Sequence, residues 1–180
     1  MLKIAKELKE KNVCEYLLYM WQVEDTIRAL GCDAERIRAD YVSGFQLTDE
    51  ERRREEEWMD NLCRMMHEEG RQEQGHLQIN QATLSLMVDL HQQLLRSPKH
   101  PFYSAAYYKA LPYIVELRAR NNKEVGELEI CLNGLYGVML LRLQHKDVTA
   151  ETQTALSAIS HLLALLADAW NKEKQGTLEL

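Results

Sequence analysis

The chain has 180 residues, of which 46% are hydrophobic and 28% are charged, and its formal net charge is −6. This length and composition are typical of one globular domain, so we expect a single helical domain over residues 1–180. The negative charge, with no sustained basic stripe, argues against a nucleic-acid partner and against binding to an anionic membrane.

Chain breakers are rare, with 3 Pro and 8 Gly, and apolar residues recur at steps of three and four, which favours long helices. No alternation typical of strands persists. We therefore expect an all-α bundle of six or seven helices joined by short connections, one of them at Asn121 and Asn122. In chain order, helices are predicted at about residues 2–30, 33–43, 49–69, 76–96, 101–120, 124–145 and 149–174, with a frayed tail after about 174.

Several helix ends carry recognisable capping residues. Asp33 and Thr149 stand at predicted N-caps, and Thr48 with Glu51 forms a capping box. Gly31 is expected to end the first helix as a C-cap.

The helix predicted at about 124–145 differs from the others because it is apolar nearly all round between Leu128 and Leu143. A helix that is apolar on every side is expected to be buried on every side, so we place it at the centre of the bundle. Gly134 and Gly137 would let a neighbouring helix approach it closely.

Polar side chains interrupt apolar helix faces at five positions. A buried arginine needs a partner, and Glu24 or Glu116 would serve Arg142. One interpretation is a polar pocket inside the bundle that binds a small anion or polar metabolite. The alternative is a structural salt-bridge network, or an Arg142 side chain that reaches solvent at the bundle end. The candidate ligand-binding residues are Glu24, Arg28, Glu116, Asn133 and Arg142.

No catalytic residue, metal site or cofactor is predicted. Di-iron bundles need two Glu-x-x-His motifs, and only Glu73 with His76 matches. His91, on an apolar stripe, is interpreted as a hydrogen-bonded core residue. Cys63 and His67 lie one helical turn apart and could form a thiol–base pair, although coincidence is the favoured interpretation.

A tyrosine-rich segment lies between residues 102 and 113. Tyrosine combines an apolar ring with a polar tip, which suits interfaces, so we expect a dimer or partner contact here if the face is exposed. Pro112 is expected to kink or split the helix. The candidate interface residues are Tyr103, Tyr107, Tyr108 and Tyr113.

The residues also favour a cytoplasmic location. The first twelve residues are amphipathic and lack the apolar core of a signal peptide, and no run of about 18 apolar residues predicts a membrane span. The four cysteines lack zinc-type spacing and are expected to be reduced thiols.

Four stretches carry a resemblance to a known family: EYLLYMWQVED (15–25), GHLQIN (75–80), PFYSAAYYKALPYIVELRA (101–119) and LYGVMLLRLQ (135–144). They resemble a bacterial family known as domain of unknown function 4924, and the likeness extends over almost the whole chain. The resemblance implies a bacterial cytoplasmic protein, of the Bacteroides group, and brings no functional residue with it.

Two hypotheses about function follow. The first is a non-enzymatic interaction or scaffold module, which could be homo-oligomeric, and it depends on the missing catalytic motifs, the tyrosine segment and the apolar last helix. The second is a small-molecule binder, or an enzyme of unfamiliar type, that uses the five polar residues. The first is favoured.

Overall fold

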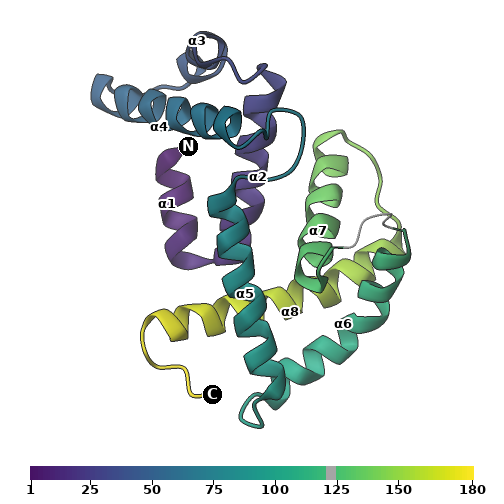
Figure 1. Ribbon diagram of the computed structural model, residues 1–180. Helices are drawn as coiled ribbons and strands as arrows, with labels where there is room; N and C mark the ends of the chain where they lie inside the picture. The colour runs from purple at the N-terminus through teal and green to yellow at the C-terminus, as the bar shows by residue number, and fades with distance from the viewer. Residues whose placement is uncertain (121–124) are drawn as a thin grey trace. The chain divides into compact units, whose positions relative to one another are not determined.

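The computed structural model describes residues 1–120 and 125–180 (Figure 1). Within these ranges every regular element is helical, which confirms the predicted all-α class. The predicted connection at Asn121 and Asn122 lies outside the described residues. The elements are α1 (Leu2–Lys11), α2 (Val13–Ala29), α3 (Ala34–Arg36), η1 (Ile37–Tyr41), η2 (Val42–Gly44), α4 (Asp49–Glu68), α5 (Gln78–Arg96), α6 (Pro101–Arg120), α7 (Glu127–Leu143) and α8 (Ala150–Lys174).

The described part contains eight α-helices, slightly more than the six or seven predicted. The first predicted helix is divided at Asn12, whose side-chain oxygen accepts a hydrogen bond from the Cys14 backbone N–H at 3.1 Å. An asparagine that bonds to the backbone two residues later favours a cap over a helix interior. The segment predicted as one helix at 33–43 is α3 followed by a π-helical turn and a 3₁₀ turn.

The predicted capping residues are confirmed. The Asp33 carboxylate accepts from two backbone N–H groups at the start of α3, and Thr149 caps α8. Thr48 and Glu51 form the reciprocal capping box of α4. Gly31 adopts a positive φ of 74° after α2, the conformation in which glycine ends helices at least cost.

The chain divides into two compact units. The N-terminal unit comprises residues 1–11 and 15–83, and the C-terminal unit comprises residues 12–14 and 84–180. The boundary falls between Lys11 and Asn12, inside α2 and inside α5, so α2 and α5 each contribute to both units. The single domain expected from chain length stays a prediction.

The N-terminal unit buries one apolar face of each of its longer helices. The core side chains of α2 lie at helical spacing, as the sequence pattern predicted, and those of α4 do the same. Its fully buried large side chains include Leu17, Met20, Trp21, Ile27, Ile37, Met59, Met66 and Leu77.

The C-terminal unit is built mainly on the packing of α6 against α8, its most extensive helix pair. Ala106 and Ala110 are buried on α6, and Ala158 and Ala167 on α8. Small side chains let two helices approach closely, which brings the larger core residues of both into contact. The helix α6 continues through Pro112 without a break, so the proline does not split it.

The helix α7 is only partly enclosed, and the prediction that it forms the buried centre of the bundle is wrong. Leu128 and Leu132 in its first half are buried, whereas Leu141 and Leu143 at its end are 37% and 61% exposed. Apolar composition could not reveal this, because it does not say which turns of a helix have neighbours.

The two glycines of α7 differ in their surroundings. A Cβ atom on Gly134 would lie 3.1 Å from Leu117 Cδ1 of α6, so this glycine does permit a close approach. A Cβ atom on Gly137 would meet nothing within 4 Å. The expected role is therefore confirmed for Gly134 and wrong for Gly137.

Among the described helices, none is both long enough and apolar enough to cross a membrane.

Candidate functional site

A buried polar cluster of the N-terminal unit surrounds Glu24. This α2 side chain is fully buried, and its Oε1 accepts from the Leu77 backbone N–H at 2.9 Å and from the Asn80 side-chain amide at 2.7 Å. Its Oε2 lies 2.7 Å from Nδ1 of His76. A buried carboxylate is tolerated when each oxygen has partners, so this cluster can keep Glu24 inside the unit.

Arg28 extends the cluster toward the segment between α4 and α5. Its guanidinium lies 3.9 Å from the Glu24 carboxylate and 2.6 Å from that of Asp25. It also donates to the backbone carbonyls of Arg71, at 3.1 Å, and of Gly75. The predicted pairing of Arg28 with Glu24 is confirmed, and Arg28 fastens this connecting segment to α2.

His76 is the member of the cluster that reaches the surface. Its imidazole stacks on Trp21 with ring centroids 4.2 Å apart, and its side chain is 20% exposed. Because a carboxylate accepts at Nδ1, that nitrogen carries the proton in the neutral ring, and Nε2 keeps its lone pair. One imidazole alone does not hold a metal, and the described residues contain no group of three or more ligand side chains placed to do so.

Asn80 has one bond left unmade. Its side chain is 1% exposed, and its Oδ1 has no hydrogen-bond partner, whereas its amide nitrogen donates to Glu24. Among the buried side-chain nitrogen and oxygen atoms of the described residues, Asn80 Oδ1 is the one without a hydrogen-bond partner. Almost every polar group of the cluster is thus satisfied within the protein, as a structural clamp requires.

The other three predicted pocket residues lie in the C-terminal unit. Glu116 is exposed on α6 and pairs with Arg120, and Asn133 is half-buried on α7. Arg142 is exposed, which agrees with the alternative interpretation that its side chain reaches solvent and excludes the buried, paired arginine. Arg142 lies in the last turn of α7, where a cation is favoured by the helix dipole and needs no acidic partner.

The predicted interior pocket of five residues does not form. Glu24 and Arg28 are brought together, but the Glu24 carboxylate is bonded to partners close to it in the N-terminal unit. The exposure of Glu116 and Arg142 removes them from any interior site.

The predicted tyrosine interface divides by burial. Tyr103 is 4% exposed, and its hydroxyl lies 2.5 Å from Nδ1 of His91, so including Tyr103 in a surface contact is wrong. Tyr107 is half-buried and donates to the Glu127 carboxylate at 3.0 Å, which ties α6 to α7. The side chain of Tyr108 remains 68% exposed.

Tyr113 is half-buried at the edge of the same helix. Two further apolar side chains of α6, Phe102 and Val115, are 84% and 55% exposed. Exposed aromatic and branched side chains in one helix indicate an association surface more often than a catalytic site.

Comparison with known proteins identifies the family. The family model described as "Domain of unknown function (DUF4924)" matches residues 2–177. The chain belongs to this family. No curated protein and no solved structure matches it. The match to the DUF4924 model includes every helix from α1 to α8, and therefore residues of both units.

The thiol–base pair considered for this DUF4924 chain is not formed. Cys63 Sγ donates to the backbone carbonyl of Cys32, and His67 Nε2 lies 2.9 Å from the same oxygen. Burial raises the pKa of the Cys63 thiol, which keeps it protonated as a donor. Both side chains therefore stabilise the turn at Cys32, whose φ of 53° is unusual for a residue other than glycine.

His91 of this DUF4924 chain is the hydrogen-bonded core residue that the sequence predicted, and it makes the unit sensitive to acid. Burial lowers the pKa of His91, so the folded state favours the neutral ring, while the unfolded chain titrates near a pKa of about 6.5. Neutral His91 therefore contributes fully to the stability of the folded state when the pH is above the pKa of the unfolded chain. This contribution is lost as the pH falls below that pKa.

We therefore expect the free energy of unfolding to drop less between pH 7.5 and pH 5.5 in His91→Gln than in the unmodified protein, as measured by urea denaturation at both pH values. His161→Gln is the matched control, because His161 is exposed on α8 and should leave the pH dependence unchanged. An unaltered pH dependence in His91→Gln would contradict this assignment.

Proposed function

We propose that the protein is a non-enzymatic interaction module that forms a homodimer through the exposed face of α6. The observation that carries this proposal is an apolar stripe with steps of three and four residues, all of it exposed. We call it the α6 stripe, and its members are Ala105, Tyr108, Pro112, Val115 and Ala119. That spacing is the one by which two helices pack along a shared seam.

Charges beside the α6 stripe favour a second copy of this chain as the partner. Lys109 and Glu116 occupy equivalent positions on one side of the stripe, seven residues apart, and both are exposed. Lys109 makes no ion pair with any described residue. When two copies of α6 run antiparallel about a point between residues 112 and 113, Lys109 of one copy faces Glu116 of the other.

A parallel pair would not match these charges. In a parallel arrangement Lys109 and Glu116 would face the opposite flank of the stripe, which carries Ser104, Leu111 and Arg118. The two ends of the stripe are alanines, whose small side chains allow the helices to approach. An antiparallel, two-fold symmetric dimer therefore fits the surface best.

Sedimentation velocity over a range of concentrations tests the proposal. We expect a dimer for the unmodified protein and a dissociation constant at least about tenfold higher for Val115→Glu, because each dimer would bury two added charges. Leu86→Glu is the matched control, since Leu86 is 58% exposed on α5 and lies outside the α6 stripe. A protein that is monomeric at every concentration, or equal effects of both substitutions, would refute the proposal.

Charge reversal tests the antiparallel arrangement separately. Lys109→Glu and Glu116→Lys should each weaken the dimer, and the double variant should recover most of the loss because the opposite charges face each other again. Recovery of the dimer affinity in the double variant would indicate that Lys109 and Glu116 face each other across the interface. Without that recovery, the two residues would act independently.

We also propose a location in the bacterial cytoplasm. It is supported by four cysteines that are all buried as free thiols, an arrangement typical of proteins kept in a reducing compartment.

A further inference from the structure

A pocket of about 620 Å³ lies in the C-terminal unit between the second half of α7 and the first half of α8. Five of its lining side chains are apolar, and they come from both helices. They are Leu135, Val138, Met139, Leu143 and Leu156. The pocket volume lies in the range of small-molecule sites.

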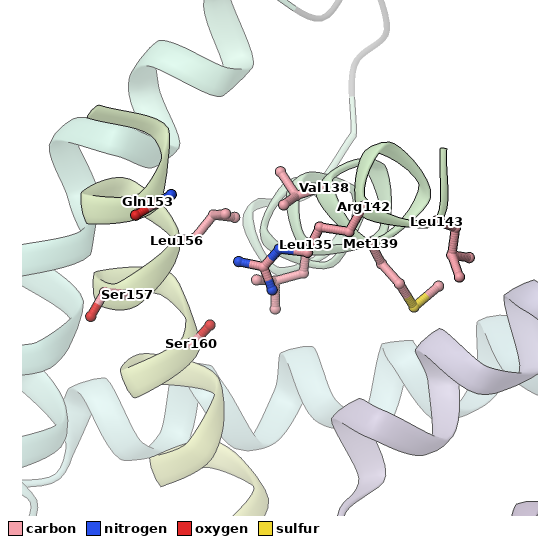
Figure 2. Close-up of a pocket in the computed structure, with 9 residues that line it drawn as sticks. All are labelled: Leu135, Val138, Met139, Arg142, Leu143, Gln153, Leu156, Ser157 and Ser160. Atoms are coloured by element: carbon pink, nitrogen blue, oxygen red, sulfur yellow. The ribbon is translucent and has the colours of Figure 1, made fainter. Parts of the chain in front are cut away.

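Arg142 is the one charged residue that lines the pocket. In Figure 2 its guanidinium extends from α7 toward α8. It makes no hydrogen bond or ion pair with any described side chain. No acidic residue lines the pocket, so a positive charge with free donors stands beside an apolar surface.

The α8 side of the pocket adds neutral polar groups. Ser157 and Ser160 present hydroxyl groups, and Gln153 presents an amide whose nitrogen donates to the Val148 carbonyl at 3.1 Å. Neither serine hydroxyl is bonded to a described residue. In Figure 2 the Ser160 hydroxyl lies on the side of α8 that faces Arg142 and can donate to a ligand there, whereas the Ser157 hydroxyl points away from α7. Ser160 and Gln153 line the same pocket as the guanidinium.

We propose that this pocket binds a small amphipathic carboxylate, of the kind represented by a medium-chain fatty acid. The planar guanidinium matches a carboxylate by paired hydrogen bonds, and the Ser160 hydroxyl adds a further donor. The hydrocarbon chain covers the five apolar side chains. An anion without a hydrocarbon chain would leave that surface in water, and an uncharged chain would leave Arg142 unpaired.

Isothermal titration calorimetry of the full chain with decanoate, decanol and acetate, each below its aggregation concentration, tests the proposal. We expect decanoate to bind one molecule per chain, decanol to bind at least about tenfold more weakly, and acetate to give no measurable heat. Acetate binding as tightly as decanoate would overturn the proposal, because it would indicate contact with surface charge alone. The absence of decanoate binding would overturn it as well.

Variants assign the binding to this pocket. Arg142→Gln should weaken decanoate at least about tenfold and leave decanol unchanged, because it removes the charge and retains much of the side chain. Leu156→Asn should weaken both ligands. Arg96→Gln is the control for net charge, since Arg96 is exposed outside the pocket. Decanoate binding that is equal in Arg142→Gln and Arg96→Gln would overturn the assignment.

The fold of Arg142→Gln is checked by circular dichroism, and its exposed position predicts no loss of helix. If it nevertheless unfolds, Arg142→Lys provides the test, because lysine keeps the charge but lacks the paired donors. Decanoate should then bind the Arg142→Lys variant more weakly than it binds the unmodified protein. It should bind this variant more tightly than decanol binds it. Equal decanoate and decanol affinity in that variant would refute the role of the charge.

Discussion

Replacing Glu24 by alanine is expected to lower the free energy of unfolding by about 3–5 kcal/mol, the range typical of removing one partner from a buried polar cluster. The Leu77 N–H and the Asn80 amide would both lose their acceptor inside the protein, and His76 and Arg28 would lose their carboxylate. Urea denaturation followed by circular dichroism gives the change in free energy.

Two further substitutions serve as controls for Glu24→Ala. Glu24→Gln keeps one acceptor oxygen and should cost less than Glu24→Ala, while Glu57→Gln changes an exposed α4 glutamate and should alter stability by less than about 0.5 kcal/mol. If Glu24→Ala and Glu57→Gln changed the free energy of unfolding by the same amount, the cluster around Glu24 would not stabilise the segment before α5.

Two leucines of α7 should lose very different amounts of stability when each is replaced by alanine. Leu132→Ala is expected to cost about 2–5 kcal/mol, because Leu132 is fully buried and its truncation leaves a cavity. Leu143→Ala, eleven residues later on the same helix, should cost less than about 0.5 kcal/mol because the side chain is 61% exposed. Both values come from urea denaturation at neutral pH.

This pair tests the partial burial of α7 directly, since helix, residue type and substitution are matched. Comparable losses at Leu132 and Leu143 would mean that the end of α7 is covered, as the sequence alone predicted. The pocket beside Arg142 would then have no open apolar surface on which to bind a hydrocarbon chain.

Features decided by neighbouring residues could be predicted from the sequence. The capping box at Thr48 and the caps at Asp33 and Thr149 depend on contacts within three residues, and each is present. The pairing of Glu24 with Arg28 spans one helical turn and was predicted for the same reason. The core position of His91 followed from the periodicity of its helix.

Features decided by distant residues could not be predicted. His76 and Asn80 reach Glu24 from more than fifty positions along the chain, and no local pattern indicates such a meeting. The signal that existed was Glu24 itself, a carboxylate in an apolar stripe that required partners somewhere. Arg142 gave the same signal, yet it reaches solvent, because burial of its helix depends on neighbours that periodicity does not specify.

The path of the chain between the two units restricts how the protein can be divided. The polypeptide passes from one unit to the other three times, between Lys11 and Asn12, within α2 and within α5, so no single peptide bond separates them. In the C-terminal unit, Cys14 Sγ donates to the Leu163 carbonyl at 3.5 Å, so this unit is incomplete without residues from near the start of the chain. Genetic exchange of either unit as a cassette would need three breakpoints, two of them inside helices. The two units are therefore expected to be inherited together, and the family match to residues 2–177 agrees with this.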